Sequence, residues 1–271
     1  MTQSHSQGAA LVTGASAGIG AVYAERLAAR GHDLVLVARD EARLQAAATD
    51  LSARYGVAVE VFRADLTDEA DIERLEAKLA DDPAIGLLVN NAGAALFGGF
   101  LDNQPAQIGK LIQLNVTAVA RLAHAAAQAF TARGRGTVVN VSSVVGLVPE
   151  YGSAVYGATK AFVTYLTQAL AHELAGKGVV FQAVLPGATR TEIWERSGRD
   201  PADLDPSRTM DADELVDAAL AGLDKGELIT IPSLPDAAEW DAYQAARAVL
   251  IPNLSKAHPA ERYGVRKLVG A

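Results

Sequence analysis

The chain contains no cysteine among its 271 residues. This absence excludes disulfides, metal sites built from thiolates and catalysis by a thiol. It does not indicate whether the protein works in an oxidising or a reducing compartment. Histidine is also scarce, and the five histidines, at positions 5, 32, 124, 172 and 258, show no spacing typical of metal ligands. We therefore expect no metal site in this protein.

Positive charge is in the minority. The chain has 24 Lys and Arg against 32 Asp and Glu, a net charge of −8 and a sequence pI of about 5.2. No basic stripe is present to bind nucleic acid. No apolar run reaches the roughly 20 residues that cross a membrane, and residues 1–7 are polar rather than an apolar signal region. We expect a cytoplasmic protein without a nucleic-acid or membrane partner.

Short apolar runs alternate with helical patterns along the chain. With 50% hydrophobic and 21% charged residues, the composition suits one large globular α/β domain. The pattern predicts strands at residues 9–12, 33–38, 57–62, 85–89, 137–141, 179–185 and 228–231, and helices at 41–54, 105–133, 154–175, 211–223 and 236–250. This alternation predicts a doubly wound parallel sheet of about seven strands. A single domain with its core at about 8–231 would then carry a short C-terminal helical extension at 232–271.

A glycine-rich turn joins the first predicted strand to a helix. It reads Thr13-Gly14-Ala15-Ser16-Ala17-Gly18-Ile19-Gly20. Glycines allow the backbone to approach a pyrophosphate, which then lies at the positive N-terminus of the helix. Three glycines can also mark a simple tight turn, but the strand before and the helix after favour dinucleotide binding.

Residues unusual for a core follow the other predicted strands at their carboxyl ends. They are Arg39, Asp65, Asn90 to Gly93, Ser143 and Pro186-Gly187. Because the carboxyl ends of parallel strands meet at one edge of the sheet, these residues predict one shared binding site there.

Tyr156 and Lys160 lie four residues apart at the start of the predicted helix 154–175. This spacing places both side chains on one helix face. An ammonium near a phenol lowers the tyrosine pKa from about 10, so Tyr156 could exchange a proton with a carbonyl or alcohol oxygen that Ser143 holds. The spacing alone is a weak signal, since it also fits a solvated lysine beside a half-buried tyrosine.

In this order and spacing, the motifs resemble the classical short-chain dehydrogenase/reductase family over about residues 8–231. The matching residues are Thr-Gly-x-x-x-Gly-x-Gly at 13–20, Asp65, Asn-Asn-Ala-Gly at 90–93, Asn115, Ser143, Tyr156-x-x-x-Lys160, and Pro186-Gly187 followed by Thr191. The resemblance implies a Rossmann-type sheet and hydride transfer between a nicotinamide cofactor and a carbonyl or alcohol carbon. The region beyond about Pro232 departs from the shorter family members.

The resemblance also implies roles for the catalytic residues. Tyr156 is the acid/base, and Ser143 orients the substrate oxygen. Lys160 binds the nicotinamide ribose and lowers the pKa of Tyr156. Asn115 holds a water that links Lys160 to solvent, although the sequence alone also allows Asn115 to be a tolerated polar residue with a local backbone bond.

Cofactor contacts are implied by the same resemblance. Asp65 and Leu66 would contact the adenine, Asn91 to Gly93 would line the cleft, and the segment after the sixth strand would hold the nicotinamide side. The predicted contacts are Gly14, Ser16, Gly18, Ile19, Gly20, Arg39, Asp65, Leu66, Asn91, Ala92, Gly93, Tyr156, Lys160, Pro186, Gly187, Thr189 and Thr191.

The end of the second predicted strand indicates NADP(H) rather than NAD(H). Ala38 stands where members of the family that use NAD carry an acid, and Arg39 follows it. Arginine can bind a 2′-phosphate with two charge-assisted bonds, and Ser16 could add a hydroxyl. Asp40 could instead hold the 2′-hydroxyl of NAD, but we expect it to cap the helix that begins at Glu41.

The residues expected around the substrate are mostly apolar. They are Leu96, Phe97, Val145, Leu147, Val148, Tyr151 and Trp194, and they favour an apolar or aromatic carbonyl. Residues 188–208 are predicted to form a mobile flap over the site, with an ordinary surface loop as the alternative. Two other functions stay open: a non-catalytic NAD(P)-binding regulatory protein, and a relative of the nucleotide-sugar epimerases and dehydratases.

An oligomer is implied by the family resemblance. Helices 105–133 and 154–175 would pack against their copies to form a homodimer or homotetramer. The stretch Ala118 to Ala132 is rich in alanine, and small side chains permit close approach of helices.

Overall fold

The computed structural model describes residues 8–96, 98–198 and 200–265. Phe97, which we predicted beside the substrate, lies outside the described residues. The chain divides into two compact units, Met1–Ser233 and Leu234–Ala271. The first unit contains all the predicted site residues.

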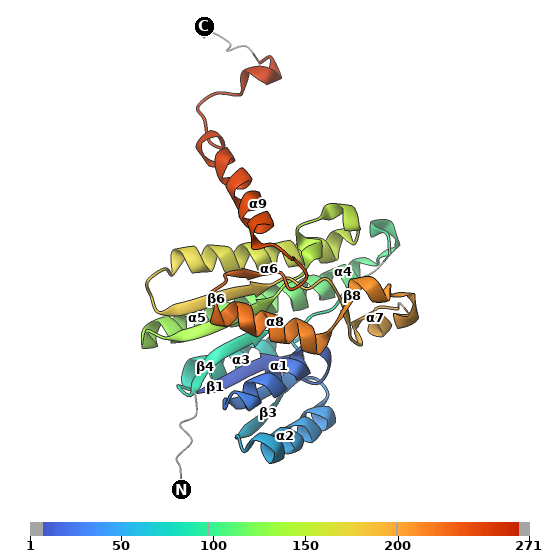
Figure 1. Cartoon of the computed structure of the whole chain (residues 1–271), viewed down its shortest axis with the longest axis vertical. Coiled ribbons are helices and arrows are strands. Elements are labelled where there is room, and N and C mark those ends of the chain that lie inside the picture. The colour runs from blue at the N-terminus through green and yellow to red at the C-terminus, as the bar shows by residue number, and fades with distance from the viewer. Residues whose placement is uncertain (1–7, 97, 199, 266–271) are drawn as a thin grey trace. The chain divides into compact units, whose positions relative to one another are not determined.

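A seven-stranded parallel sheet forms the centre of the first unit (Figure 1). Its strand order is β3-β2-β1-β4-β5-β6-β9. The strands are β1 (Ala9–Thr13), β2 (Asp33–Ala38), β3 (Val59–Arg63), β4 (Ile85–Asn90), β5 (Gly136–Val141), β6 (Val179–Val184) and β9 (Ile229–Thr230). The order runs outward from β1 in one direction and then from β4 in the other, so the predicted doubly wound Rossmann-type α/β fold is confirmed.

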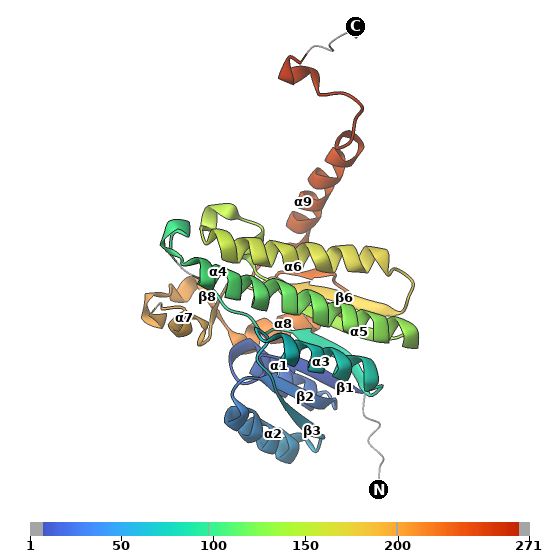
Figure 2. The same cartoon turned by 180° about the vertical axis from the view of Figure 1, so that it is seen from behind.

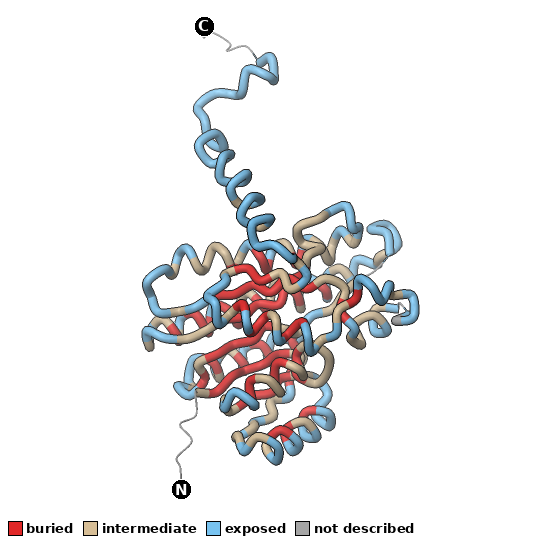
Figure 3. Tube along the Cα trace, in the orientation of Figure 1, coloured by how far each residue is buried: buried red, intermediate tan, exposed pale blue. Residues whose placement is uncertain are grey.

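Helices cover both faces of the sheet (Figures 1 and 2). One face carries α1 (Gly18–Ala29), α2 (Glu41–Tyr55) and α8 (Ala212–Asp224), and the other carries α3 (Glu69–Asp81), α5 (Val119–Arg133) and α6 (Ala154–Glu173). The strands are apolar at successive positions, so their side chains contribute to a hydrophobic core on each face of the sheet. In β1, Val12 packs in the core under α1, α2 and α8, and Leu11 packs in the core on the opposite face. Buried residues accordingly concentrate along the strands (Figure 3).

Local sequence signals set several helix ends. Asp40 accepts a hydrogen bond from the Arg43 amide at 3.1 Å and begins α2, so the predicted cap is confirmed. Asp68 accepts from the Ala70 amide at 2.9 Å and begins α3. Gly134, at φ 67°, follows α5, where a left-handed residue ends the helix without a Cβ penalty.

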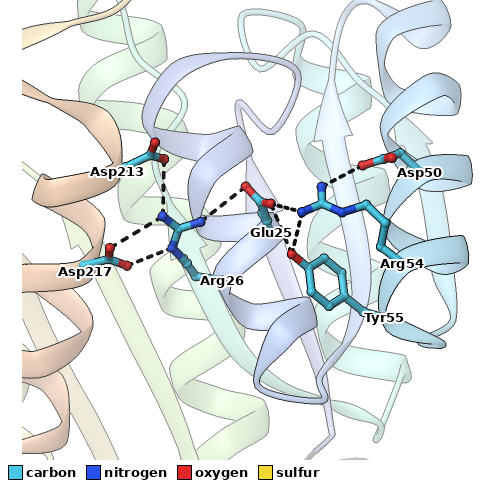
Figure 4. Close-up of polar contacts among 7 residues, drawn as sticks. All are labelled: Glu25, Arg26, Asp50, Arg54, Tyr55, Asp213 and Asp217. Carbon is cyan, nitrogen blue, oxygen red and sulfur yellow. Dashed lines mark hydrogen bonds and ion pairs between the residues drawn. The ribbon is translucent and has the colours of Figure 1, made fainter.

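Charged side chains tie α1 to the helices on either side of it (Figure 4). Arg26 of α1 pairs with Asp217 of α8, with Nε 2.8 Å from Oδ1. Glu25 accepts hydrogen bonds from Arg54 and, at 3.1 Å, from Tyr55 at the end of α2. These contacts join segments far apart in the sequence on the surface of one helical layer.

The predicted helix 105–133 is not uniform. It consists of α4 (Pro105–Ile112), a π-helical segment (Gln113–Ala118) and α5. The π segment contains Asn115, whose buried amide bonds to residues outside the helix rather than to a local carbonyl. Single π turns inside helices are frequent at functional sites.

The predicted flap has secondary structure of its own. It contains β7 (Ala188–Arg190) and α7 (Ile193–Arg196), and β7 pairs in parallel with β8 (Thr209–Asp211), which directly follows the flap. Arg190 Nε donates to Asp211 Oδ1 at 2.6 Å. Asp211 therefore binds Arg190, and its side chain makes no capping bond at α8.

The second unit contains α9 (Ala237–Leu250), which Asp236 caps through the Ala238 amide at 2.9 Å. The rings of Trp240 and Tyr243 stack with centroids 5.2 Å apart. None of the residues of α9 is buried. Across the described parts of the chain, no helix combines the length and the apolar character needed to span a membrane.

Candidate active site

Tyr156 and Lys160 project from the start of α6, as their spacing predicts. The Lys160 ammonium lies 5.8 Å from the centroid of the Tyr156 ring. Lys160 is buried, and its Nζ donates to the Val141 carbonyl at 2.9 Å. Because Val141 ends β5, this bond fixes the lysine at the carboxyl edge of the sheet.

Burial controls the pKa of both side chains. It lowers the pKa of Lys160 to about 8. Burial also raises the pKa of Tyr156, and the neighbouring Ser143 hydroxyl opposes that rise only in part. Burial thus opposes the lowering of the Tyr156 pKa that is expected from Lys160, since the charged phenolate loses its surrounding water.

Ser143 connects the ends of β5 and β6. Its hydroxyl donates to the Pro186 carbonyl at 3.3 Å and accepts from the Val145 amide at 3.3 Å. The residue is buried beside the Tyr156 phenol. A substrate oxygen that reaches the phenol therefore also comes within reach of this hydroxyl.

Asn115 faces the same region from the π-helical segment. Its Oδ1 accepts from the Ala94 amide at 3.0 Å, and its Nδ2 donates to the Ala94 carbonyl at 2.9 Å. A Cβ built on Gly93 would lie 3.3 Å from Asn115 Oδ1 and 3.6 Å from Lys160 Nζ. The absence of a side chain at Gly93 thus leaves these two polar atoms facing one small space.

The glycine-rich turn packs tightly against the loop after β4. A Cβ on Gly20 would come 2.3 Å from the Gly14 carbonyl oxygen, so the turn depends on glycine there. The Thr13 hydroxyl accepts from the amides of Asn91 and Ala92, each at 3.0 Å. Asn91 in turn donates to the Thr13 carbonyl at 2.9 Å.

The start of α1 is suited to an anion. Among the described residues, no side chain caps this helix N-terminus, which begins at Gly18. Its first backbone amides therefore keep their capacity to donate, in the field of the helix dipole. Ser16 lies half-buried just before the helix, and Ile19 packs against the core.

Arg39 and Asp65 lie farther along the same edge of the sheet. Arg39 directly follows β2 and is exposed. Burial raises the pKa of Asp65. The hydrogen bonds from Thr67 and the charges of the nearby Arg39 and Arg63 together lower it by more, so the pKa lies below its ordinary value. Leu66 is buried in the core.

The flap begins against the glycine-rich turn. A Cβ on Gly18 would lie 3.1 Å from Thr191 Cγ2. The next residue, Glu192, accepts from Arg43 of α2, with both carboxylate oxygens 3.0 Å from Nη1. The Trp194 indole donates to the Thr189 carbonyl at 2.7 Å. The segment thus crosses from the end of β6 to the start of α2.

The structure brings most of the predicted site residues together. The catalytic side chains, the glycine-rich turn, Asn91 to Gly93 and the segment Pro186 to Thr191 lie at the carboxyl ends of β1, β4, β5 and β6. The glycine cradle at 14–20, the open start of α1 and the exposed Arg39 fit a phosphorylated dinucleotide. Within the described ranges, no group of His, Cys, Asp and Glu could hold a metal ion.

Two residues that organise the site have no individual role predicted from the sequence. Thr13 holds the loop after β4 through two backbone amides. Thr159 holds Asn115 and lies at a position that the Tyr156-x-x-x-Lys160 motif leaves unspecified.

Comparison with known proteins agrees with this arrangement. Residues 8–202 match the family described as short chain dehydrogenase. A short-chain dehydrogenase from Sphingobium yanoikuyae, solved in complex with NADPH, is 54% identical and superposes with a TM-score of 0.92 over 94% of this chain and 99% of that one.

Two further relatives are similar. A bulky-bulky ketone specific alcohol dehydrogenase from Comamonas testosteroni is 47% identical, with a TM-score of 0.87 over 94% of this chain and 98% of that one. A very-long-chain 3-oxoacyl-CoA reductase from Bos taurus is 36% identical over 191 residues. That match covers 68% of this chain and only 60% of the curated relative.

Proposed function

Since the chain belongs to the classical short-chain dehydrogenase/reductase family and is an oxidoreductase, we propose that it interconverts an apolar or aromatic ketone and its secondary alcohol with NADP(H). The observation that supports this most directly is the gathering of the four predicted catalytic side chains at the carboxyl edge of the sheet. A pure nucleotide-binding protein would have no use for a phenol and an ammonium buried together there.

Tyr156 is proposed as the proton donor in ketone reduction. When bound, the nicotinamide supplies the hydride to the carbonyl carbon. Because burial raises its pKa, Tyr156 is a neutral phenol at neutral pH and can give its proton to the developing alkoxide. Ser143 holds the same oxygen through its hydroxyl, which stabilises the charge as it forms.

Lys160 is proposed to support and restore Tyr156. Its ammonium stabilises the phenolate that remains after the proton has left. With a pKa of about 8, Lys160 can also release and regain a proton near neutral pH. The small space between its Nζ and Asn115 Oδ1 suits a water that would carry protons toward solvent.

NADP(H) is proposed over NAD(H) because of the end of β2. Ala38 presents no acid to repel a 2′-phosphate, and Arg39 is exposed at the position where that phosphate would lie. Asp40, the competing acid, instead caps α2, where its Oδ1 accepts from the Arg43 amide at 3.1 Å. The Sphingobium relative was solved with NADPH.

A bulky ketone is the proposed substrate class. Leu147 and Val148 are partly buried in the segment between β5 and α6, and Tyr151 is exposed in the same segment. The Comamonas relative is described as specific for bulky-bulky ketones. The remaining cofactor and catalytic assignments, the cytoplasmic location, the single domain and the homo-oligomer expected from the sequence stay predictions.

Oxidation of NADPH with a panel of ketones tests this function. We expect turnover that rises from small aliphatic ketones to diaryl or aryl-alkyl ketones. Binding of NADPH without turnover of any ketone or oxidation of any alcohol would favour a non-catalytic binding protein instead. Conversion of a nucleotide sugar without net NADPH oxidation would favour an epimerase relative.

A further inference from the structure

A threonine inside the Tyr156–Lys160 interval makes two directional hydrogen bonds. Thr159 is 3% exposed. Its Oγ1 donates to the Tyr156 carbonyl at 2.7 Å and accepts from Asn115 Nδ2 at 3.2 Å. The hydroxyl therefore joins the catalytic helix α6 to the π-helical segment.

The two bonds leave no ambiguity in direction. A hydroxyl carries one hydrogen, and that of Thr159 points to a carbonyl, which can only accept. The side of Asn115 that faces Thr159 must therefore be its NH₂ group. Ala94 requires the same orientation, because its carbonyl faces Nδ2 and its amide faces Oδ1.

The orientation of the amide decides what faces Lys160. With Nδ2 toward Thr159, the Oδ1 acceptor lies beside Gly93, and the same small space borders Lys160 Nζ. We propose that Thr159 is a positioning residue, which together with the Ala94 backbone holds Asn115 in place, so that an acceptor rather than a donor faces the Lys160 ammonium. This inference rests on the proposed function and adds to it a residue that does not touch the reacting atoms.

Thr167 offers a matched control on the same helix. It is fully buried, donates to the Val163 carbonyl at 2.7 Å and accepts from Asn140 Nδ2 at 2.9 Å. It thus repeats the bonding pattern of Thr159, two turns farther along α6 and without a link to Lys160. Loss of either hydroxyl leaves a buried asparagine with one partner fewer.

The test compares Thr159→Val, Thr159→Ser and Thr167→Val. We expect Thr159→Val to lower kcat about tenfold or more, the effect of one misplaced buried hydrogen bond, with little change in KM for NADPH. Thr159→Ser keeps the hydroxyl and should regain most of the wild-type kcat. Thr167→Val should lose a similar amount of stability and keep its kcat. A crystal structure of Thr159→Val should show Asn115 displaced from Ala94.

Several results would overturn the inference. Wild-type kcat in Thr159→Val, an equal fall of kcat in Thr167→Val, or no recovery in Thr159→Ser would each do so, as would an unmoved Asn115 in the crystal structure. Failure of the proposed function is a separate outcome: the wild type itself would then bind NADPH and reduce no ketone, and no positioning role for that reaction would remain.

Discussion

Burial of an ionisable side chain is the main physical cost at this site. Lys160 is buried, and its ammonium donates a hydrogen bond to the Val141 carbonyl. The lowered pKa expresses this cost, because the charged form is less favourable in the folded state than in water. Lys160 therefore lowers the stability of the fold, and we expect it to be kept for its role in the reaction.

Lys160→Met should accordingly stabilise the protein at neutral pH while abolishing turnover. The lysine pKa falls from about 10.4 in the unfolded chain to about 8 in the fold, so the cost is full below pH 8 and disappears as the pH rises through the unfolded value. Allowing for the lost bond to Val141, we expect a gain of about 1–3 kcal/mol at pH 7. Urea unfolding at several pH values measures it, with the exposed Lys177→Met as the control. A less stable Lys160→Met at pH 7 would contradict the account.

Arg39→Ala tests the choice of cofactor. Removing a charge-assisted bond should cost about 1.5–3 kcal/mol, a loss of roughly ten- to hundredfold in kcat/KM for NADPH, with NADH little changed. Arg63→Ala is the matched control, since Arg63 is also exposed and also lies near Asp65. A wild type that prefers NADH, or a mutant that loses both cofactors equally, would refute the assignment.

The strand-helix pattern could be predicted almost completely because each strand is a short apolar run between turn signals. The strand 33–38 was predicted with the bounds that β2 has, and the cap at Asp40 followed from the residue type. The π-helical segment could not be predicted in this way. Asn115 bonds to Ala94 and Thr159, which lie 21 and 44 residues away, and only the fold brings them together.

The same limit applies to other contacts between elements. The Tyr156–Lys160 pair follows from helix geometry, but the pKa directions depend on burial that a motif does not carry. The polar residues at 188–208 predict a flap, or alternatively a surface loop, and neither reading includes the parallel pairing of β7 with β8 some twenty residues later. The exposed ion pair between Arg43 and Glu192 likewise joins two elements that are far apart in the sequence.

The flap is the element we expect to change most when cofactor binds. Its contact with α2 is the exposed ion pair between Arg43 and Glu192, and such pairs contribute only about 0–1 kcal/mol. Residues 189–210, apart from Arg199 outside the described residues, should exchange amide hydrogens faster than the strands in the free protein. NADPH with a substrate analogue should slow that exchange, while peptides from β1 and β4 serve as the unchanged reference. Equal protection with and without ligand would argue against a lid.

At the scale of the whole molecule, exposed apolar residues on α4 and α6 indicate an interface. Ile112 is 42%, Phe162 37% and Tyr165 73% exposed. Large apolar side chains gathered on neighbouring helices are typical of association surfaces. We therefore propose that these helices pack against a second copy, as the family resemblance implies.

Sedimentation at micromolar concentration should show a dimer or tetramer. Tyr165→Asp should shift this equilibrium toward monomer, since it places a charge in the proposed contact. Leu101→Asp, at an exposed apolar residue outside these helices, should leave the assembly unchanged. A wild type that sediments only as a monomer would refute the interface.

The central claim is that Tyr156 supplies the proton for hydride transfer with NADP(H). The most direct test measures ketone reduction by the wild type and by Tyr156→Phe, with NADPH binding followed in parallel by fluorescence. We predict that Tyr156→Phe binds NADPH as tightly as the wild type and loses at least about 10²-fold in kcat, as removal of a general acid requires. Turnover within a few-fold of the wild type, with NADPH bound normally, would contradict the account.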